Sequence, residues 1–428
     1  TTPWCESLGS AGTQMKRVKG LTVANRIPED PIVRKLVGMF NQQQVSRRQL
    51  LRGAAVGAAG ASTLALAACA PGGGSGGIDR GDGSAGSFVW GNWPLYLDYD
   101  EANNTYPSLD AFMAQTNINV DYIEDIDDNN TFYGKIKDQL AQNQYTGYDV
   151  ITFTDWMNAR LIDDGQVQAF DYANMPNVTA NLIQSQWDAL SNDPGRQYTV
   201  PWQLPAACFI WDNEAVPNGI KTLDDFLQPD LKGKVGMLSE MRDTMGIIML
   251  GQGVNISGDW GDAEFDLALE WLQKAVDGGW VVLKGNSYAE DLELGNTVAA
   301  IAWTGDMVAT NVDLGNPWTL EVPESGGTIA ADAFTVPNGT DPENKPLIEE
   351  MINYYYEPEV AAQVADYVWF VTPVQGAQEA MEQINPENVD NPFIFPDAEM
   401  DSRLHSFRAL SPQEDKKYSE AFAKVMGL

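Results

Sequence analysis

The chain has 428 residues, of which 44% are hydrophobic and 20% charged, with 26 Lys and Arg against 60 Asp and Glu. A formal net charge of −34 makes nucleic acid and anionic lipid surfaces poor partners and favours a cationic ligand. Adaptation to salt, or simple solubility, is the commoner reason for such a composition, and screening prevents diffuse charge from forming a site by itself.

Residues 46–69 read SRRQLLRGAAVGAAGASTLALAAC, which has the organisation of an export signal rather than of a buried Ala-rich helix. The twin-arginine pair Arg47-Arg48 precedes an apolar run of 16 residues, shorter than the roughly 20 that a permanent membrane helix needs. The ending Leu-Ala-Ala-Cys resembles a bacterial lipobox, where cleavage precedes the Cys and lipid is attached to its sulfur. We therefore expect residues 1–68 to be a leader and twin-arginine lipoprotein signal, and Cys69 to carry the lipid.

A Gly/Ser-rich linker, residues 69–87, follows the signal and as a flexible coil spans about 20–25 Å. We expect it to tether an extracytoplasmic body to the outer face of the cytoplasmic membrane, in the periplasm or the cell-wall space. After cleavage only Cys69 and Cys208 are left of the three cysteines, so no internal disulfide is expected. With His405 as the single histidine, zinc-ligand sets cannot be assembled, and we expect no metal and no cofactor.

From Phe88 onward, short apolar runs alternate with helical patterns, which predicts α/β layers. The runs predicted as buried strands are Phe88–Trp90, Ile118–Ile123, Val150–Phe153, Phe209–Trp211, Val298–Trp303 and Ala333–Val336. Apolar stripes at helical spacing begin at Phe132, Phe265 and Leu347, and an apolar helix is expected after Asp243. Ser411-Pro412-Gln413-Glu414 predicts the start of the last helix, because it combines an N-cap with a capping box.

Aromatic residues and carboxylates recur together next to the predicted strands and before one predicted helix. The segments are Asn92–Tyr96, Thr154–Trp156, Glu240–Asp243, Trp303–Asp306 and Asp332. Because strand ends line the ligand crevice of open α/β sheets, we expect several of these side chains to face a ligand. Each segment alone is also explained by core packing or by a charge pair at a helix start. Their joint placement is what favours a site.

These residue types suit a slender organic polycation. An ammonium group taken out of water needs a carboxylate partner and further hydrogen bonds. Aromatic faces cover a methylene chain and attract the adjacent charge by about 0.5–2 kcal/mol per contact. Two carboxylate groups separated by an aromatic wall would therefore measure the length of a diamine. Paired carboxylates with Trp platforms also occur in glycoside hydrolases, but no spacing here singles out an acid and a nucleophile.

From about Phe88 to its C-terminus, the chain resembles the spermidine/putrescine-binding subunits of bacterial ABC importers. The matching stretches are Asn92-Trp93 with Tyr96, Tyr148–Ile151, Val200–Trp202, Leu238–Asp243, Ala300–Asp306, Pro323–Gly327 with Asp332, and Phe395–Ala398. The Ala300–Asp306 and Pro323–Gly327 stretches are the most specific, whereas the others are common to wider groups of solute-binding proteins.

The resemblance implies an α/β, two-lobed periplasmic-binding-protein-like clamshell of type II, each lobe a mixed sheet flanked by helices. Its expected N-terminal lobe is residues 88–202 plus 332–374, and its C-terminal lobe is residues 203–331 plus 375–428. The polyamine would lie between the lobes.

By position, the resemblance also implies a role for each site residue. Aromatic walls, a hydrogen-bonding hydroxyl and two groups of amine-binding carboxylates are expected from Trp93, Tyr96, Thr154, Trp156, Glu240, Asp243, Trp303, Asp306 and Asp332. Ala330 stands where an aromatic residue is expected, and Phe370 replaces a Tyr. Leu95 follows the Pro after Trp93 where a polar residue is usual. These departures leave the preferred amine open.

We therefore expect a non-enzymatic, monomeric lipoprotein that captures a polyamine of the putrescine/spermidine class and delivers it to ABC permease subunits. Nucleic acid is not an expected partner. The alternatives are a binder of another cationic amine or of a sugar in the same fold, and a carbohydrate-active enzyme.

Overall fold

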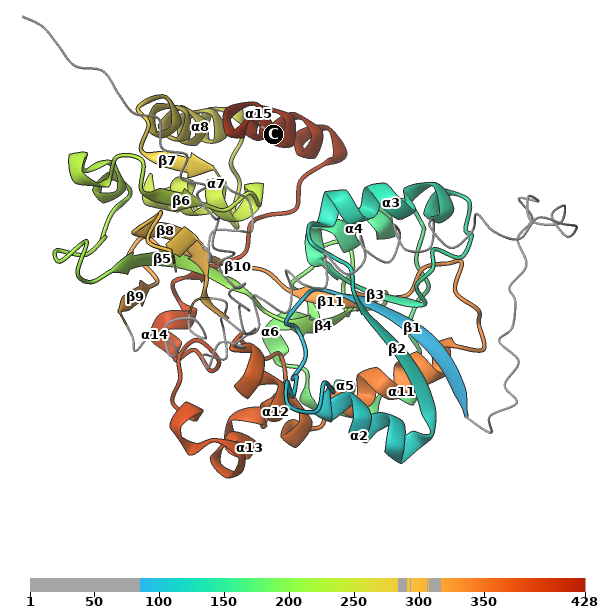
Figure 1. Cartoon of the computed structure of the whole chain (residues 1–428). Coiled ribbons are helices and arrows are strands. Elements are labelled where there is room, and N and C mark those ends of the chain that lie inside the picture. The colour runs from blue at the N-terminus through green and yellow to red at the C-terminus, as the bar shows by residue number, and fades with distance from the viewer. Residues whose placement is uncertain (1–84, 284–290, 293, 306, 308–316, 428) are drawn as a thin grey trace, which may run out of the picture. The chain divides into compact units, whose positions relative to one another are not determined.

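The computed structural model describes residues 85–283, 291–292, 294–305, 307 and 317–427. The export signal, Cys69 and Asp306 lie outside the described residues. The described residues form two mixed β-sheets with helices packed on them (Figure 1).

The first sheet has the strand order β2-β1-β3-β11-β4. Its strands are β1 (Gly86–Asn92), β2 (Ile118–Glu124), β3 (Val150–Thr154), β4 (Val200–Gln203) and β11 (Asp332–Thr335). Strand β1 is parallel to β2 and β3, whereas β11 is antiparallel to β3 and β4. The antiparallel strand therefore begins beside the end of β3, with Asp332 in register with Thr154.

Helices cover both faces of the first sheet: α2 (Pro107–Thr116), α11 (Lys345–Tyr355) and α12 (Pro358–Val368) on one, α3 (Asn129–Ala141) and α4 (Asp155–Asp163) on the other. Strand β3 shows why both faces are apolar, because its side chains alternate between two cores. Val150 packs with the first set of helices, whereas Ile151 and Phe153 pack with the second.

The second sheet has the order β12-β10-β5-β8-β6-β7, and β9 also pairs with β5. Its strands are β5 (Ala206–Asp212), β6 (Val235–Met237), β7 (Val281–Leu283), β8 (Ala299–Trp303), β9 (Trp318–Glu321), β10 (Gly327–Ile329) and β12 (Leu404–His405). Helices α7 (Met241–Gly251), α8 (Asp262–Asp277) and α15 (Pro412–Met426) share the core of this sheet. In Figure 1, α8 and α15 lie side by side.

The shorter elements are α5 (Pro176–Asn181), α6 (Gln184–Trp187), α13 (Ala377–Ile384), α14 (Ala398–Asp401), and the 3₁₀ turns η1 (Tyr172–Asn174), η2 (Leu223–Leu227), η3 (Pro229–Leu231) and η5 (Pro386–Asn388). The chain passes from the first sheet to the second between Gln203 and Ala206, and it returns between Ile329 and Asp332. The two passages contact each other, because the Ala330 N–H donates to the Pro205 carbonyl at 3.2 Å.

All six strands predicted from the sequence are present, with ends that coincide or differ by up to three residues. The other described strands were not predicted. They are two to four residues long, which is too short to show a period. The predicted capping box is confirmed, because Ser411 accepts from the Glu414 N–H and Glu414 accepts from the Ser411 N–H. Cys208 is buried and free.

Candidate functional site

Asp332 lies at the start of β11 and is 3% exposed. The Thr154 hydroxyl donates to its Oδ1 at 2.6 Å, and the Tyr96 hydroxyl donates to its Oδ2 at 2.6 Å. Burial raises the pKa of Asp332 to about 7, although these two hydrogen bonds lower it. The strand register brings Thr154, the last residue of β3, beside Asp332, the first residue of β11. The Tyr96 hydroxyl adds a third residue of the predicted site.

Asp243, in the first turn of α7, is held in the same way by the second sheet. The Trp303 indole N–H donates to its Oδ2 at 2.8 Å, and the Thr328 hydroxyl donates to its Oδ1 at 2.6 Å. Trp303 ends β8 and Thr328 lies in β10. Burial raises the pKa of Asp243, and the two hydrogen bonds and the positive charge of Arg242 oppose that shift.

The negative charges of Asp155 and Asp243 further raise the pKa of Asp332. Asp332 begins a strand of the first sheet, Asp243 is bonded to strands of the second, and the side chains that donate hydrogen bonds to them are neutral. Two buried like charges in one place are unfavourable, so a cation between them would be stabilised by both. We call Asp243 and Asp332 the carboxylate pair.

Glu240 is the N-cap of α7 and accepts a hydrogen bond from the Arg242 backbone N–H at 3.2 Å. Burial raises the pKa of Glu240 to about 7, the Arg242 guanidinium lowers it, and Asp243 and Asp128 raise it further. An anion at a helix N-terminus is also stabilised by the helix dipole. Glu240 and Asp243 lie at the same end of α7. Of the two, within the described residues, Glu240 has a guanidinium at ion-pair distance, with Nη1 of Arg242 3.8 Å from its Oε1.

Trp156, in the first turn of α4, faces two arginines. The Cζ of Arg242 lies 3.9 Å from a Trp156 ring centre, and that of Arg160 lies 5.6 Å away. Both guanidinium groups are paired with Asp415 of α15, Arg242 at 2.6 Å. Sequence reasoning assigned no role to these arginines or to Asp415. Arg242 lies inside a matched stretch, but nothing in the sequence indicated Asp415, 173 positions away.

Trp93 and Tyr96 follow β1, and their rings are 6.3 Å apart. The Trp93 indole N–H donates to the Thr152 carbonyl at 3.0 Å, and the ring packs against both cores of the first sheet. Phe370 lies 5.3 Å from the Tyr96 ring, so the position that lacks the expected hydroxyl still contributes an aromatic contact.

A cleft of about 1260 Å³ brings together Thr154, Trp156, Glu240 and Asp243. Arg242, Asp415 and Ala330 also line it. The other described residues of the predicted site, Trp93, Tyr96, Trp303 and Asp332, are not among its lining residues. Tyr96 and Asp332 are therefore connected to the cleft through Thr154, whose hydroxyl joins its wall to the buried carboxylate.

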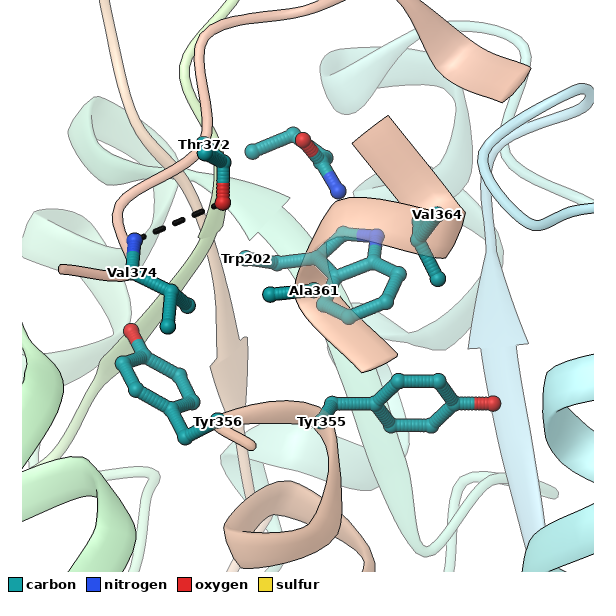
Figure 2. A pocket seen from close by; sticks show the side chains of 8 residues that line it. Trp202, Tyr355, Tyr356, Ala361, Val364, Thr372 and Val374 are labelled. Atoms are coloured by element: carbon teal, nitrogen blue, oxygen red, sulfur yellow. Dashed lines mark hydrogen bonds between the residues drawn. The ribbon is translucent and has the colours of Figure 1, made fainter. Parts of the chain in front are cut away.

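A second cavity beside β4 is too small for an organic ligand. Figure 2 shows Trp202, Tyr355 and Tyr356 around it, with Val374 donating its N–H to the Thr372 hydroxyl at 3.4 Å. Its volume of about 10 Å³ is room for a single water at most. The large cleft, unlike this cavity, has room for a small solute.

Among the described residues, no group of three or more His, Cys, Asp or Glu is arranged to hold a metal ion. In the same part of the chain, no helix is both long and apolar enough to cross a membrane.

Comparison with known proteins gives a consistent result. Residues 108–391 match the family described as bacterial extracellular solute-binding protein. The spermidine/putrescine-binding periplasmic protein of Escherichia coli is 24% identical over 296 residues, 68% of this chain and 80% of that protein. The putrescine-binding periplasmic protein PotF of the same organism is 24% identical over 357 residues, 78% of this chain and 90% of its own length.

Among solved structures, the spermidine/putrescine ABC transporter substrate-binding protein PotD from Streptococcus pneumoniae superposes with a TM-score of 0.66. The match covers 80% of this chain and 98% of that one at 21% identity, which establishes the fold. The predicted fold class is thus confirmed: two mixed α/β sheets arranged as in periplasmic binding proteins. These relatives are solute-binding proteins and not enzymes, so the carbohydrate-active enzyme is not retained.

Proposed function

Because this chain belongs to the bacterial extracellular solute-binding protein family, we propose that it captures a polyamine of the putrescine/spermidine class and delivers it to an ABC permease. The observation that carries the proposal is the carboxylate pair. Asp332 is buried and Asp243 is partly buried, each accepts hydrogen bonds from two neutral donors, and the negative charge of Asp243 contributes to the raised pKa of Asp332. A neutral sugar would leave both buried charges uncompensated, whereas an ammonium group would pair with them.

In this proposal the carboxylate pair binds the ammonium end of the ligand, and Thr154 orients Asp332. Trp303 covers the methylene chain while its N–H holds Asp243. Trp93 and Tyr96 support the wall behind Asp332, with Tyr96 bonded to the carboxylate directly. Glu240 and Asp306 would supply further carboxylates for amine groups, and Trp156 would supply an aromatic face.

We further propose that binding closes two lobes about the segments that connect the sheets, with lobes of residues 88–202 plus 332–374 and 203–331 plus 375–428. Two such connecting segments contact each other through the hydrogen bond from the Ala330 N–H to the Pro205 carbonyl. Ala377, Met381 and Ile394, which follow the proposed boundary at residue 374, share a hydrophobic core with residues of the N-terminal lobe.

The export signal supports a tethered form of this protein, which we propose acts as a monomer. A twin-arginine lipoprotein signal ending at Cys69 would place the binding body outside the cytoplasmic membrane, and the linker at 69–87 would let it reach its permease. Replacing Cys69 by Ser should release the protein from membranes without changing ligand binding. Fractionation of cells that express both forms would measure this, and a membrane-bound Ser variant would contradict the lipid anchor.

Putrescine, spermidine or spermine should raise the melting temperature of the purified protein by several degrees. A ligand at 100 times its Kd stabilises the native state by about 2.7 kcal/mol, because it binds only the folded form. Differential scanning fluorimetry at low and moderate salt measures the shift, with glucose and maltose as neutral controls. A shift with a sugar, and none with any amine, would contradict the proposal.

A further inference from the structure

Arg242 already lies where the proposed site would hold an amine cation. Its Cζ is 3.9 Å from a ring centre of Trp156, the distance at which a cation is attracted by an aromatic face. Its Nη1 is 3.8 Å from Oε1 of Glu240. An aromatic face and a carboxylate are the two partners that an ammonium group needs, and here one guanidinium contacts both.

Asp415 fixes Arg242 in this place. Its Oδ1 pairs with Nη2 of Arg242 at 2.6 Å, and its Oδ2 pairs with Arg160. The side chains of Arg242 and Asp415 are 11% and 14% exposed, so solvent screens their attraction only weakly. Planar guanidinium groups also lose less side-chain freedom on pairing than ammonium groups do. The guanidinium is therefore an ordered part of the cleft wall.

The carboxylate pair differs from Glu240 in its charged partners among the described residues. Asp243 accepts from the neutral donors Trp303 and Thr328, and Asp332 accepts from Tyr96 and Thr154. Neither has a guanidinium or ammonium group within ion-pair distance in the described residues, whereas Glu240 does. A cation of the protein therefore lies beside Glu240, whereas the hydrogen-bond donors to the carboxylate pair are neutral.

We propose that Arg242 determines ligand length: it occupies the subsite of Trp156 and Glu240, so the cleft prefers a short diamine to a longer triamine. This inference rests on the proposed function. A short diamine would place one ammonium group at the carboxylate pair without reaching the guanidinium of Arg242. The far ammonium of a triamine would meet the guanidinium, and two cations on one aromatic face repel each other in a site of reduced dielectric.

The chain contains a matched control in a second arginine that lines the same cleft. The Cζ of Arg408 lies 4.0 Å from the Trp260 ring centre, and its guanidinium pairs with Glu414 at 2.7 Å. Arg408 also lines the cleft. Arg408→Gln therefore removes the same charge and the same kind of stacking contact as Arg242→Gln, but away from Trp156 and Glu240.

The test compares binding of 1,4-diaminobutane and spermidine by the full chain, using calorimetry at one fixed ionic strength. We expect the unaltered protein to bind the diamine more tightly than the triamine. Arg242→Gln should raise spermidine affinity at least tenfold while the diamine affinity changes less than threefold, and Arg408→Gln should leave the ratio unchanged. Arg242→Met, which keeps an unbranched side chain without charge, should reproduce the result, and melting curves establish that each variant is folded.

Several outcomes would overturn the inference. A triamine preference in the unaltered protein would do so, as would equal gains for both ligands or the same change in Arg408→Gln. In these cases amine binding itself, and hence the proposed function, would stand. If no amine binds to any of the proteins, the proposed function fails and the inference fails with it.

Discussion

Asp332→Asn should weaken amine binding by about two orders of magnitude and yet leave the ligand-free protein at least as stable as before. Removing one partner of a buried, hydrogen-bonded charge pair costs about 2–5 kcal/mol of binding free energy. The carboxylate of Asp332 is 3% exposed, so little of its attraction for an ammonium group is lost to solvent.

The stability of the variant follows from the same contacts. Asn keeps the shape of Asp and an oxygen that accepts one hydrogen bond, and the hydroxyls of Tyr96 and Thr154 rotate to accept as well as donate. The substitution also removes a buried charge that lies near Asp243 and Asp155. We expect the free energy of unfolding at pH 7.5 to stay constant or rise by about 1 kcal/mol, a loss of function without a loss of stability.

Asp193 provides the control, because it is a buried carboxylate with a purely structural set of contacts. It accepts from the backbone N–H groups of Tyr198 and Thr199 and from the Thr199 hydroxyl, and it is 1% exposed. Asp193→Asn should lower the free energy of unfolding by about 1–3 kcal/mol and leave amine affinity unchanged. Calorimetric titration and chemical denaturation of both variants measure the contrast. Unchanged amine affinity in Asp332→Asn would show that the site is elsewhere.

The ligand-free protein should become more stable as the pH falls from about 7 to 5, whereas amine affinity should decrease over the same range. The folded-state pKa values of Asp332 and Glu240 are raised to about 7, above those of unfolded Asp and Glu near 4. Between these limits the native state binds more protons than the unfolded state, so the free energy of unfolding decreases with rising pH. The slope approaches about 1.4 kcal/mol per pH unit for each group.

Amine binding has the opposite sign because an ammonium group requires the ionised carboxylate. Below pH 7 the ionised fraction of Asp332 falls about tenfold per pH unit, and affinity should follow it. Melting curves with and without putrescine from pH 5 to 8 measure both trends. Asp332→Asn should flatten the stability profile partly, since Glu240 still titrates. A ligand-free protein that loses stability steadily from pH 7 to 5 would contradict the assignment.

Both predictions rest on one property of the site. Burial of Asp243, Asp332 and Glu240 raises the pKa of each carboxyl group, which means that the folded protein holds their charges at a cost in stability. A cationic ligand removes that cost, so ligand binding and stability are linked. The same reasoning explains the position of Arg242, whose guanidinium already compensates Glu240.

The sequence by itself determined the α/β class, the principal strands and helices, and the residue types of the site. Alternating and helical apolar periods are local properties of the chain, and the capping box at Ser411 is complete within four residues. The segments that begin at Thr154, Glu240 and Trp303 could also be recognised, because carboxylates and aromatic residues close to predicted strand or helix ends form a local sequence pattern. Strands as short as β12, of two residues, gave no period to detect.

Only the tertiary structure decided which of these groups meet. Thr154 and Asp332 are 178 positions apart and become neighbours through an antiparallel strand register, which no local pattern encodes. The pairing of Arg242 with Trp156 and Asp415 likewise joins α7, α4 and α15. Contacts between distant segments depend on how whole elements pack, and the charge balance of a buried site depends on those contacts. The sequence thus indicated residue types suited to a cation, and the packing places the guanidinium of Arg242 against two of those residues, Trp156 and Glu240.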